Sequence, residues 1–149
     1  MANQDLTHKI IGAAIEVHRQ LGPGLLESAY EECLARELSI RGLFFERQKP
    51  IPVVYKGVKL ECGYRIDLLV EHQIVLELKA IEQIAAIHEA VVLTYLKLSG
   101  ITVGLLINFH VAVLKDGIRR YIWKEKKDLT TEYAKVRRDN GEVENNPNV

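Results

Sequence analysis

The chain has 149 residues, and its 20 Lys and Arg balance its 20 Asp and Glu, so the formal net charge is zero. With 48% hydrophobic residues, a chain of this length forms one hydrophobic core, which excludes a wholly disordered or fibrous protein. The charge balance also removes the simplest argument for a nucleic-acid partner, a strongly basic domain, so such a partner must be argued from a site.

The cysteine content and the hydropathy pattern indicate the compartment. Cys33 and Cys62 form no CxxC pair, and the N-terminus has no basic region followed by an apolar stretch. The longest apolar run, residues 101–114, is interrupted by Asn108 and His110 and is shorter than the ~20 residues of a membrane helix. We therefore expect a cytoplasmic protein with two packed, reduced thiols and no membrane contact.

Two helices are predicted in the first 42 residues. The first begins at a cap formed by Asp5 or Thr7 and ends at the Gly-Pro-Gly of residues 22–24, which cannot continue a helix. The second covers residues 26–41, and Gly42 ends it. The apolar positions at helical spacing are Ile10, Ile11, Ala14, Ile15, Val17 and Leu21 in the first helix, and Leu26, Tyr30, Leu34 and Leu38 in the second.

Residues 43–79 are predicted to form strands. Pro50 and Pro52 place the first strand, which ends at residues 53–55, at a sheet edge or make it irregular. Turns at residues 56–57 and 71–73 separate the strands that follow. Those strands are residues 58–61, 64–70 and 74–79. Because short turns join consecutive segments, we expect an antiparallel meander.

A helix, a buried strand and a hairpin are predicted after residue 80. Helical spacing returns over residues 84–98. One face of this helix consists of Ile84, Ile87, His88, Val91, Tyr95 and Leu98. Residues 103–109 form a nearly all-apolar strand of the kind that is buried on both faces. The Asp-Gly pair at residues 116–117 predicts a hairpin between strands at 112–114 and 118–123.

These elements predict a single domain over residues 1–123, followed by a charged extension over residues 124–149. In the extension we expect one short helix, over residues 129–138, and a disordered end. The predicted order is two helices, four strands, a helix and three strands. This order indicates an α/β fold with a mixed central sheet flanked by helices.

Asp67, Glu77 and Lys79 form the pattern most suggestive of chemistry. Side chains alternate faces along a strand, so Glu77 and Lys79 point the same way, and a hairpin at residues 71–73 brings Asp67 near Glu77. Two carboxylates a few ångströms apart repel unless a cation lies between them, and Mg²⁺ or Mn²⁺ fits that need. The alternative is a solvated sheet face on which Asp67 pairs with Arg65 or Lys79.

Residues 24–30, Gly-Leu-Leu-Glu-Ser-Ala-Tyr, match a GxxExxY pattern, and the chain resembles the family of small proteins named after this pattern. The resemblance continues in the same order through residues 17–24, 48–50, 55–57, 67–70, 77–80 and 104–109, and it covers roughly residues 5–123. That family is placed in the PD-(D/E)XK nuclease-like superfamily. The resemblance therefore implies a restriction-endonuclease-like αβββαβ core.

The resemblance also implies roles for individual residues. Asp67 corresponds to the first acidic metal ligand of the superfamily, Glu77 to the second, and Lys79 to the lysine of the motif. The backbone carbonyl of Leu78 completes the shell of a Mg²⁺ or Mn²⁺ ion in such sites. Glu27 corresponds to an acidic residue from the preceding helix; alternatively, it is a glutamate favoured in the first turn by the helix dipole.

One position departs from the pattern of the exonuclease-type members, which carry a glutamine four residues before a tyrosine on the helix after the lysine strand. Tyr95 is present, but Val91 occupies the glutamine position and cannot form hydrogen bonds with its side chain. His88, one turn earlier, is a candidate substitute or a packing residue. His18 has the same two interpretations, and Tyr95 is equally explained as a core aromatic.

The leading hypothesis is a Mg²⁺-dependent nuclease-like protein that hydrolyses phosphodiester bonds, with DNA or RNA as its partner. The alternative is a catalytically weak or inactive module that binds nucleic acid or a protein through a local positive surface. The cations available for that surface are Lys56, Lys59, Arg119, Arg120 and Lys124. A third hypothesis is a self-associating assembly protein, and the sequence leaves a homodimer open. The charge balance predicts few phosphate contacts and a shallow salt dependence of binding.

Overall fold

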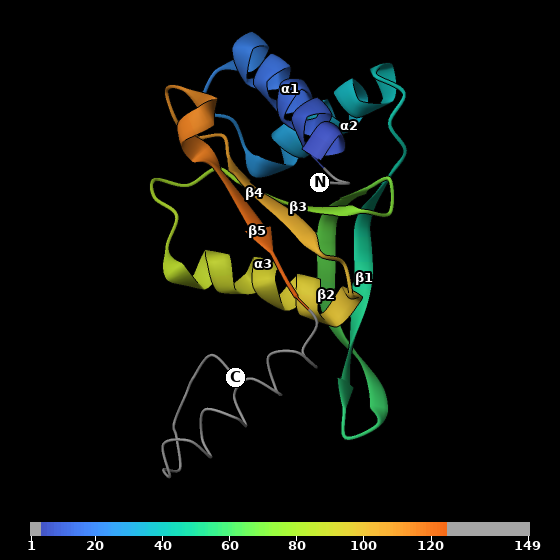
Figure 1. Cartoon of the computed structure of the whole chain (residues 1–149). Coiled ribbons are helices and arrows are strands. Elements are labelled where there is room, and N and C mark those ends of the chain that lie inside the picture. The colour runs from blue at the N-terminus through green and yellow to red at the C-terminus, as the bar shows by residue number, and fades with distance from the viewer. Residues whose placement is uncertain (1–3, 125–149) are drawn as a thin grey trace, which may run out of the picture.

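A five-stranded sheet with helices on both faces forms the body of the molecule (Figure 1). The computed structural model describes residues 4–124. Its elements are α1 (Gln4–Leu21), α2 (Glu27–Ile40), β1 (Phe45–Tyr55), β2 (Val58–Val70), β3 (Ile74–Lys79), α3 (Ala86–Ser99), β4 (Val103–Asn108), the 3-10 helix η1 (Leu114–Gly117) and β5 (Ile118–Ile122). The predicted helix at residues 129–138, with the rest of the extension from residue 125, lies outside the described residues.

The sheet is mixed, as the sequence predicts. Its strand order is β1-β2-β3-β4-β5, with β3 and β4 parallel and every other neighbouring pair antiparallel. The helix α3 connects the two parallel strands, because parallel neighbours need a crossover of this length. The antiparallel meander β1-β2-β3 and the edge position of the proline-containing β1 are both confirmed.

Two apolar clusters cover the two faces of the sheet. The helices α1 and α2 pack residues such as Ile10 and Leu34 against Leu68 and Leu76 on one face. On the other face, α3 packs Leu96 in a cluster of buried residues that comprises Ile51, Ile66, Leu69, Val75, Tyr95 and Leu96. All six residues of β4 are buried, as expected for an apolar strand between helix layers. Figure 1 shows α1 and α2 above the sheet and α3 below it.

The two predicted strands over residues 58–70 form one strand, β2. It folds back on β1 through Lys56 and Gly57, whose φ values of 47° and 80° suit a tight hairpin turn. A register shift lies between Ile51 and Val53, and Gly63 has a φ of 82°. The break predicted between residues 61 and 64 is therefore a β-bulge within one continuous strand.

Two predictions near the C-terminal end of the fold are wrong. Residues 112–114 are not a strand: Leu114 begins the 3-10 helix η1, and the strand that pairs with β5 is β4. The reason lies at Gly117, where a Cβ atom would collide with the carbonyl oxygen of Asn108. The glycine of the Asp-Gly pair thus permits a close backbone approach and does not form a two-residue hairpin turn.

The buried face of α3 also differs from the predicted one. Val92, Tyr95 and Leu96 are its buried residues, whereas Ile87 is 66% exposed and Val91 only half-buried. The helix is apolar on several sides, so spacing alone did not identify the face that meets the sheet. Within the described residues, no helix is long and apolar enough to cross a membrane.

Candidate functional site

The hairpin between β2 and β3 brings Asp67 and Glu77 together. The last ladder pair is Leu68 with Leu76, so the next step places Asp67 directly opposite Glu77. At that step the Asp67 side chain replaces a backbone partner: its Oδ2 accepts a hydrogen bond of 2.8 Å from the backbone N–H of Leu78. The strands separate here, and the gap between them contains carboxylates.

Glu77 is a buried carboxyl group that lacks, within the described part of the chain, a hydrogen-bond partner for one of its two oxygens. The residue is only 6% exposed, and among the described residues its Oε1 has no hydrogen-bond partner. Its Oε2 lies 3.7 Å from the Nζ of Lys79, which points the same way, as strand alternation predicts. Burial, followed by the negative charge of Asp67, raises the pKa of Glu77 to about 8, although Lys79 acts to lower it.

The pKa of Asp67 is also raised, mainly by burial. The hydrogen bond from Leu78 opposes this shift, whereas the nearby charge of Glu31 adds to it. Gln48 connects these groups: its Nε2 donates to the Oε1 of Glu31 at 2.8 Å and to the Oδ1 of Asp67 at 3.3 Å. The alternative in which Asp67 pairs with Arg65 or Lys79 is not what the structure shows, because neither cation forms an ion pair with it.

Glu31, Arg47 and Gln48 were not singled out in the sequence. Arg47 forms ion pairs with Glu31 at 3.0 Å and with Glu32 at 2.9 Å, which hold the start of β1 against α2. Glu31 follows Glu27 by four residues, so the two lie on one face of α2. The four-residue spacing of Glu27 and Glu31 is the sequence signal that could have identified Glu31. The hydrogen bonds of Gln48 depend on a contact between α2 and β1, which no local sequence pattern predicts.

Glu27 stays at the margin of the site. It is exposed at the first position of α2, and its charge contributes to the raised pKa values of both Asp67 and Glu77. In residues 4–124, no three His, Cys, Asp or Glu side chains lie close enough to share one metal ion. The donor set that fits a divalent cation is therefore the pair of Asp67 and Glu77, whose unpartnered oxygen is a free ligand.

The two histidines singled out have structural contacts. The Nδ1 of His88 accepts a hydrogen bond of 2.8 Å from the backbone N–H of Ala85 and so caps α3. The Nε2 of His18, which is buried, lies 2.8 Å from the carbonyl oxygen of Val111. Each has the role of a satisfied packing residue.

Tyr95 belongs to the apolar cluster on the α3 side of the sheet. Burial raises its pKa, and the charges of Glu77 and Asp67 raise it further. Its ring meets that of Tyr64 edge to face at 6.3 Å. Val91 lies one turn before Tyr95 and packs against the apolar cluster on the α3 side of the sheet. Both residues of α3 thus belong to the apolar packing on this side of the sheet, and Val91 occupies the position at which exonuclease-type members carry a glutamine.

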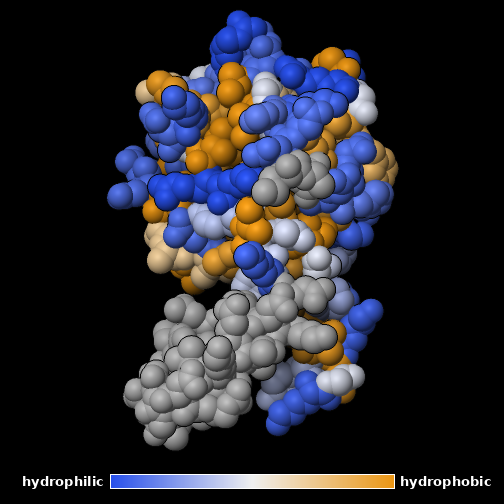
Figure 2. Space-filling view, in the orientation of Figure 1, coloured by the Kyte–Doolittle hydropathy of each residue, from blue (hydrophilic) through white to orange (hydrophobic). Residues whose placement is uncertain are grey.

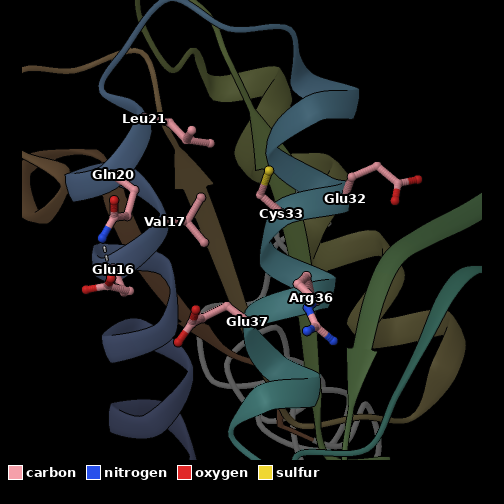
Figure 3. A pocket seen from close by; sticks show the side chains of 8 residues that line it. All are labelled: Glu16, Val17, Gln20, Leu21, Glu32, Cys33, Arg36 and Glu37. Carbon is pink, nitrogen blue, oxygen red and sulfur yellow. Dashed lines mark hydrogen bonds between the residues drawn. The ribbon is translucent and has the colours of Figure 1, made fainter.

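A hollow of about 260 Å³ between α1 and α2 lies apart from these groups. Figure 3 shows Val17 and Leu21 of α1 facing Cys33 of α2 across it. Cys33 is half-buried and Cys62 is exposed, so the prediction of two packed thiols holds for Cys33 alone; neither forms a disulfide. None of the residues that line the hollow is one of the candidate site residues.

Comparison with protein families identifies the superfamily to which this fold belongs. A family model described as the PD-(D/E)XK nuclease superfamily matches residues 4–121. Searches of curated proteins and of solved structures returned no match. The matched segment covers every helix and almost every strand of the described fold, and its sheet and helix layers agree with a restriction-endonuclease-like architecture. The chain therefore belongs to the PD-(D/E)XK nuclease superfamily.

Proposed function

We propose that this protein is a metal-dependent nuclease that hydrolyses phosphodiester bonds, with Asp67 and Glu77 holding a Mg²⁺ or Mn²⁺ ion. The observation that carries the proposal is the state of Glu77, a buried carboxyl group with an unpartnered oxygen opposite a second carboxyl group. Burying such a pair is costly unless a cation compensates both charges. A divalent ion with oxygen ligands supplies that compensation.

The residues around the pair have distinct parts in the proposed reaction. A bound divalent ion supplies an acidic water and screens the charge of the phosphate. Lys79 positions the attacking water and offsets charge on the phosphate oxygens. The water gives up a proton to solvent and attacks phosphorus, the bond to the leaving oxygen breaks, and that oxygen takes up a proton from solvent. The backbone carbonyl of Leu78 is a further ligand in this proposal, and Glu27 supports the ion through its charge.

A second function, that of a nuclease fold that binds nucleic acid or protein without cleavage, has one observation in its favour. Val91 leaves the α3 side of the site without an amide, and the described residues contain only a pair of carboxylates for the ion. Membership in the GxxExxY family, a cytoplasmic location and a homodimer stay predictions from the sequence.

Cleavage assays test the proposal directly. Single- and double-stranded DNA and RNA are incubated with the protein and Mg²⁺ or Mn²⁺, and products are resolved on denaturing gels. We expect Glu77→Ala and Lys79→Ala each to lower the cleavage rate by about 10²–10³-fold, the size of the loss of one preorganised charged group. Glu82→Ala is the matched control, because this neighbouring glutamate has a 97% exposed side chain. Cleavage that persists in the Glu77→Ala/Lys79→Ala double variant contradicts the site assignment.

Calorimetric titration with Mn²⁺ separates the enzyme from the binding module. We expect binding that is lost in Glu77→Ala and retained in Glu82→Ala, since ion binding needs the paired carboxylates. Absence of binding at millimolar Mn²⁺, together with absence of cleavage, favours the non-catalytic alternative.

A further inference from the structure

Residues 50–65 of β1 and β2 form a two-stranded arm that extends beyond the rest of the sheet. The strand β3 pairs with β2 only over Leu68–Val70, so the arm has no third strand among the residues that the structure describes, and residues 58–65 of β2 are all exposed. Figure 1 shows the arm projecting from the lower end of the sheet, and Figure 2 shows hydrophobic and hydrophilic surface side by side on it. Apolar side chains exposed on a two-stranded ribbon are not explained by core packing, and exposed apolar patches often mark interaction sites.

One face of the arm is apolar and uncovered. The ladder pairs Ile51 with Tyr64 and Tyr55 with Val58, and alternation places them on the face that α3 covers nearer the body. Ile51 is buried there, but beyond it the helix gives no cover. The exposed side chains on this face include Tyr55, which is 60% exposed, Val58 and Leu60. Tyr64 is 45% exposed, although its ring also contacts that of Tyr95 on α3. Both tyrosine rings are thus at least partly accessible to solvent.

The arm also carries free positive charge. Its cations are Lys56, Lys59 and Arg65, and its single acidic residue is Glu61. Within the described part of the chain these three cations form no ion pair, whereas cations beside the site, such as Arg47, are paired with carboxylates. The Nζ of Lys56 lies 5.5 Å from the centre of the Tyr55 ring, so cation and aromatic surface occur together at the tip.

The arm begins at the candidate site. Arg65 is two residues from Asp67 along β2, and Lys59 is eight residues away. At about 3.3 Å per residue these cations lie roughly 7 Å and 26 Å along the strand from Asp67. A polyanion that runs along the arm would therefore reach the carboxylate pair at its base.

We propose that the arm binds single-stranded nucleic acid, with Tyr55 and Tyr64 stacking on unpaired bases and the three cations contacting phosphates. Lys56 lies beside the Tyr55 ring, and strand alternation places Lys59 and Arg65 on the opposite face of the ribbon, where a strand that passes around its edge would meet them. Exposed rings and cations on one ribbon are the combination that binds single strands, since the bases of a duplex are already stacked on one another. A second copy of the chain fits less well, because pairing two arms would bring their unpaired cations together. The inference rests on the proposed function for the identity of the partner.

Fluorescence anisotropy with a labelled oligothymidylate of about 16 nucleotides tests this, in EDTA so that cleavage plays no part. We expect the Lys56→Gln/Lys59→Gln variant to bind more weakly and to lower the slope of log K against log salt by about 1.4, at about 0.7 per phosphate contact. Tyr55→Ala should bind about 5- to 100-fold more weakly. The matched control is Lys9→Gln/Lys115→Gln, two exposed lysines on α1 and η1 that form no ion pair within residues 4–124.

Melting curves establish that each variant is folded, which is expected because the substituted side chains are exposed. The proposal is overturned if the wild-type protein does not bind the oligonucleotide, or if folded arm variants bind it with unchanged affinity and salt slope. It is equally overturned if light scattering shows a wild-type dimer that Tyr55→Ala abolishes while nucleic-acid binding persists. Arm-dependent binding without cleavage in any metal supports the arm and contradicts the proposed function, so the two failures are distinguishable.

Discussion

The two halves of β2 are built from one continuous strand but have opposite relations to solvent. The inner half, residues 66–70, lies between helix layers and carries Asp67 opposite Glu77. The outer half, residues 58–65, is exposed along its whole length and carries cations without carboxylate partners. The difference teaches that one end of the strand brings together carboxyl groups whose ionisation burial makes costly, whereas the other end leaves positive charge and aromatic surface accessible.

The largest expected difference between the halves is in stability. Leu68 is fully buried in the inner half, and Leu60 is 41% exposed in the outer half. We expect Leu68→Ala to lower the free energy of unfolding by about 3–5 kcal/mol because it leaves a cavity. Leu60→Ala should change it by no more than about 0.5 kcal/mol. Denaturant melts of both variants measure the contrast, and equal losses would show that the arm is a packed part of the core.

A pH series sharpens the electrostatic side of the comparison. The pKa of Glu77 is about 8 in the folded protein, above its ordinary value of 4.5, so the folded state binds the proton more tightly than the unfolded state. Stability without metal should therefore fall as the pH rises from about 4.5 to 8, where the buried carboxyl group becomes charged. Glu77→Gln removes this loss, and we expect a gain of about 2–4 kcal/mol at pH 9 and little change at pH 4.

The control for that series is Glu61→Gln, the acidic residue on the exposed half of the same strand. The free energy of unfolding of the Glu61→Gln variant should equal that of the wild type at every pH. A wild-type protein whose metal-free stability does not fall between pH 5 and pH 8 would contradict the raised pKa of Glu77.

The smallest expected effect concerns Gln48, which lies on β1 beside Asp67 of the inner half. Its amide joins the carboxyl groups of Glu31 and Asp67, while its own φ of 50° is unfavourable for a residue with a side chain. Gln48→Ala removes both hydrogen bonds, and we expect a loss of about 1–2 kcal/mol in unfolding free energy. Gln48→Gly loses the same bonds but relaxes the backbone, so thermal melts should find it more stable than Gln48→Ala. The reverse order would show that the left-handed backbone carries no cost here.

Much of the fold followed from local patterns. The alternation along residues 64–79 predicted the hairpin that places Asp67 opposite Glu77, and the apolar run of β4 predicted its burial. The tight turn at Glu71 and His72, with φ values of 52° and 57°, was predicted as a turn although neither residue is glycine. These successes have one cause: each depends on residues close together in the sequence.

What could not be predicted depends on distant contacts. The role of Gly117 follows from its approach to Asn108, and the face of α3 was decided by the sheet it packs on. The network of Glu31, Arg47 and Gln48 joins α2 to β1, segments that no periodic pattern relates. The zero net charge of the whole chain was also uninformative, because it does not show that cations lie on the outer half of β2 and a half-buried carboxyl group on its inner half.

The prolines of β1 have a consequence for the behaviour of the protein at high concentration. β1 is an edge strand, and within residues 4–124 the outer half of β2 has no neighbouring strand on its other side, so the arm has two open edges in the described part of the chain. Open edges with apolar side chains are templates for aggregation through strand addition. Pro50 and Pro52 remove backbone donors from one edge, and Lys59 adds charge to the strand beside it. The prolines and the lysine therefore oppose strand addition at the arm, whose apolar face is exposed among the described residues.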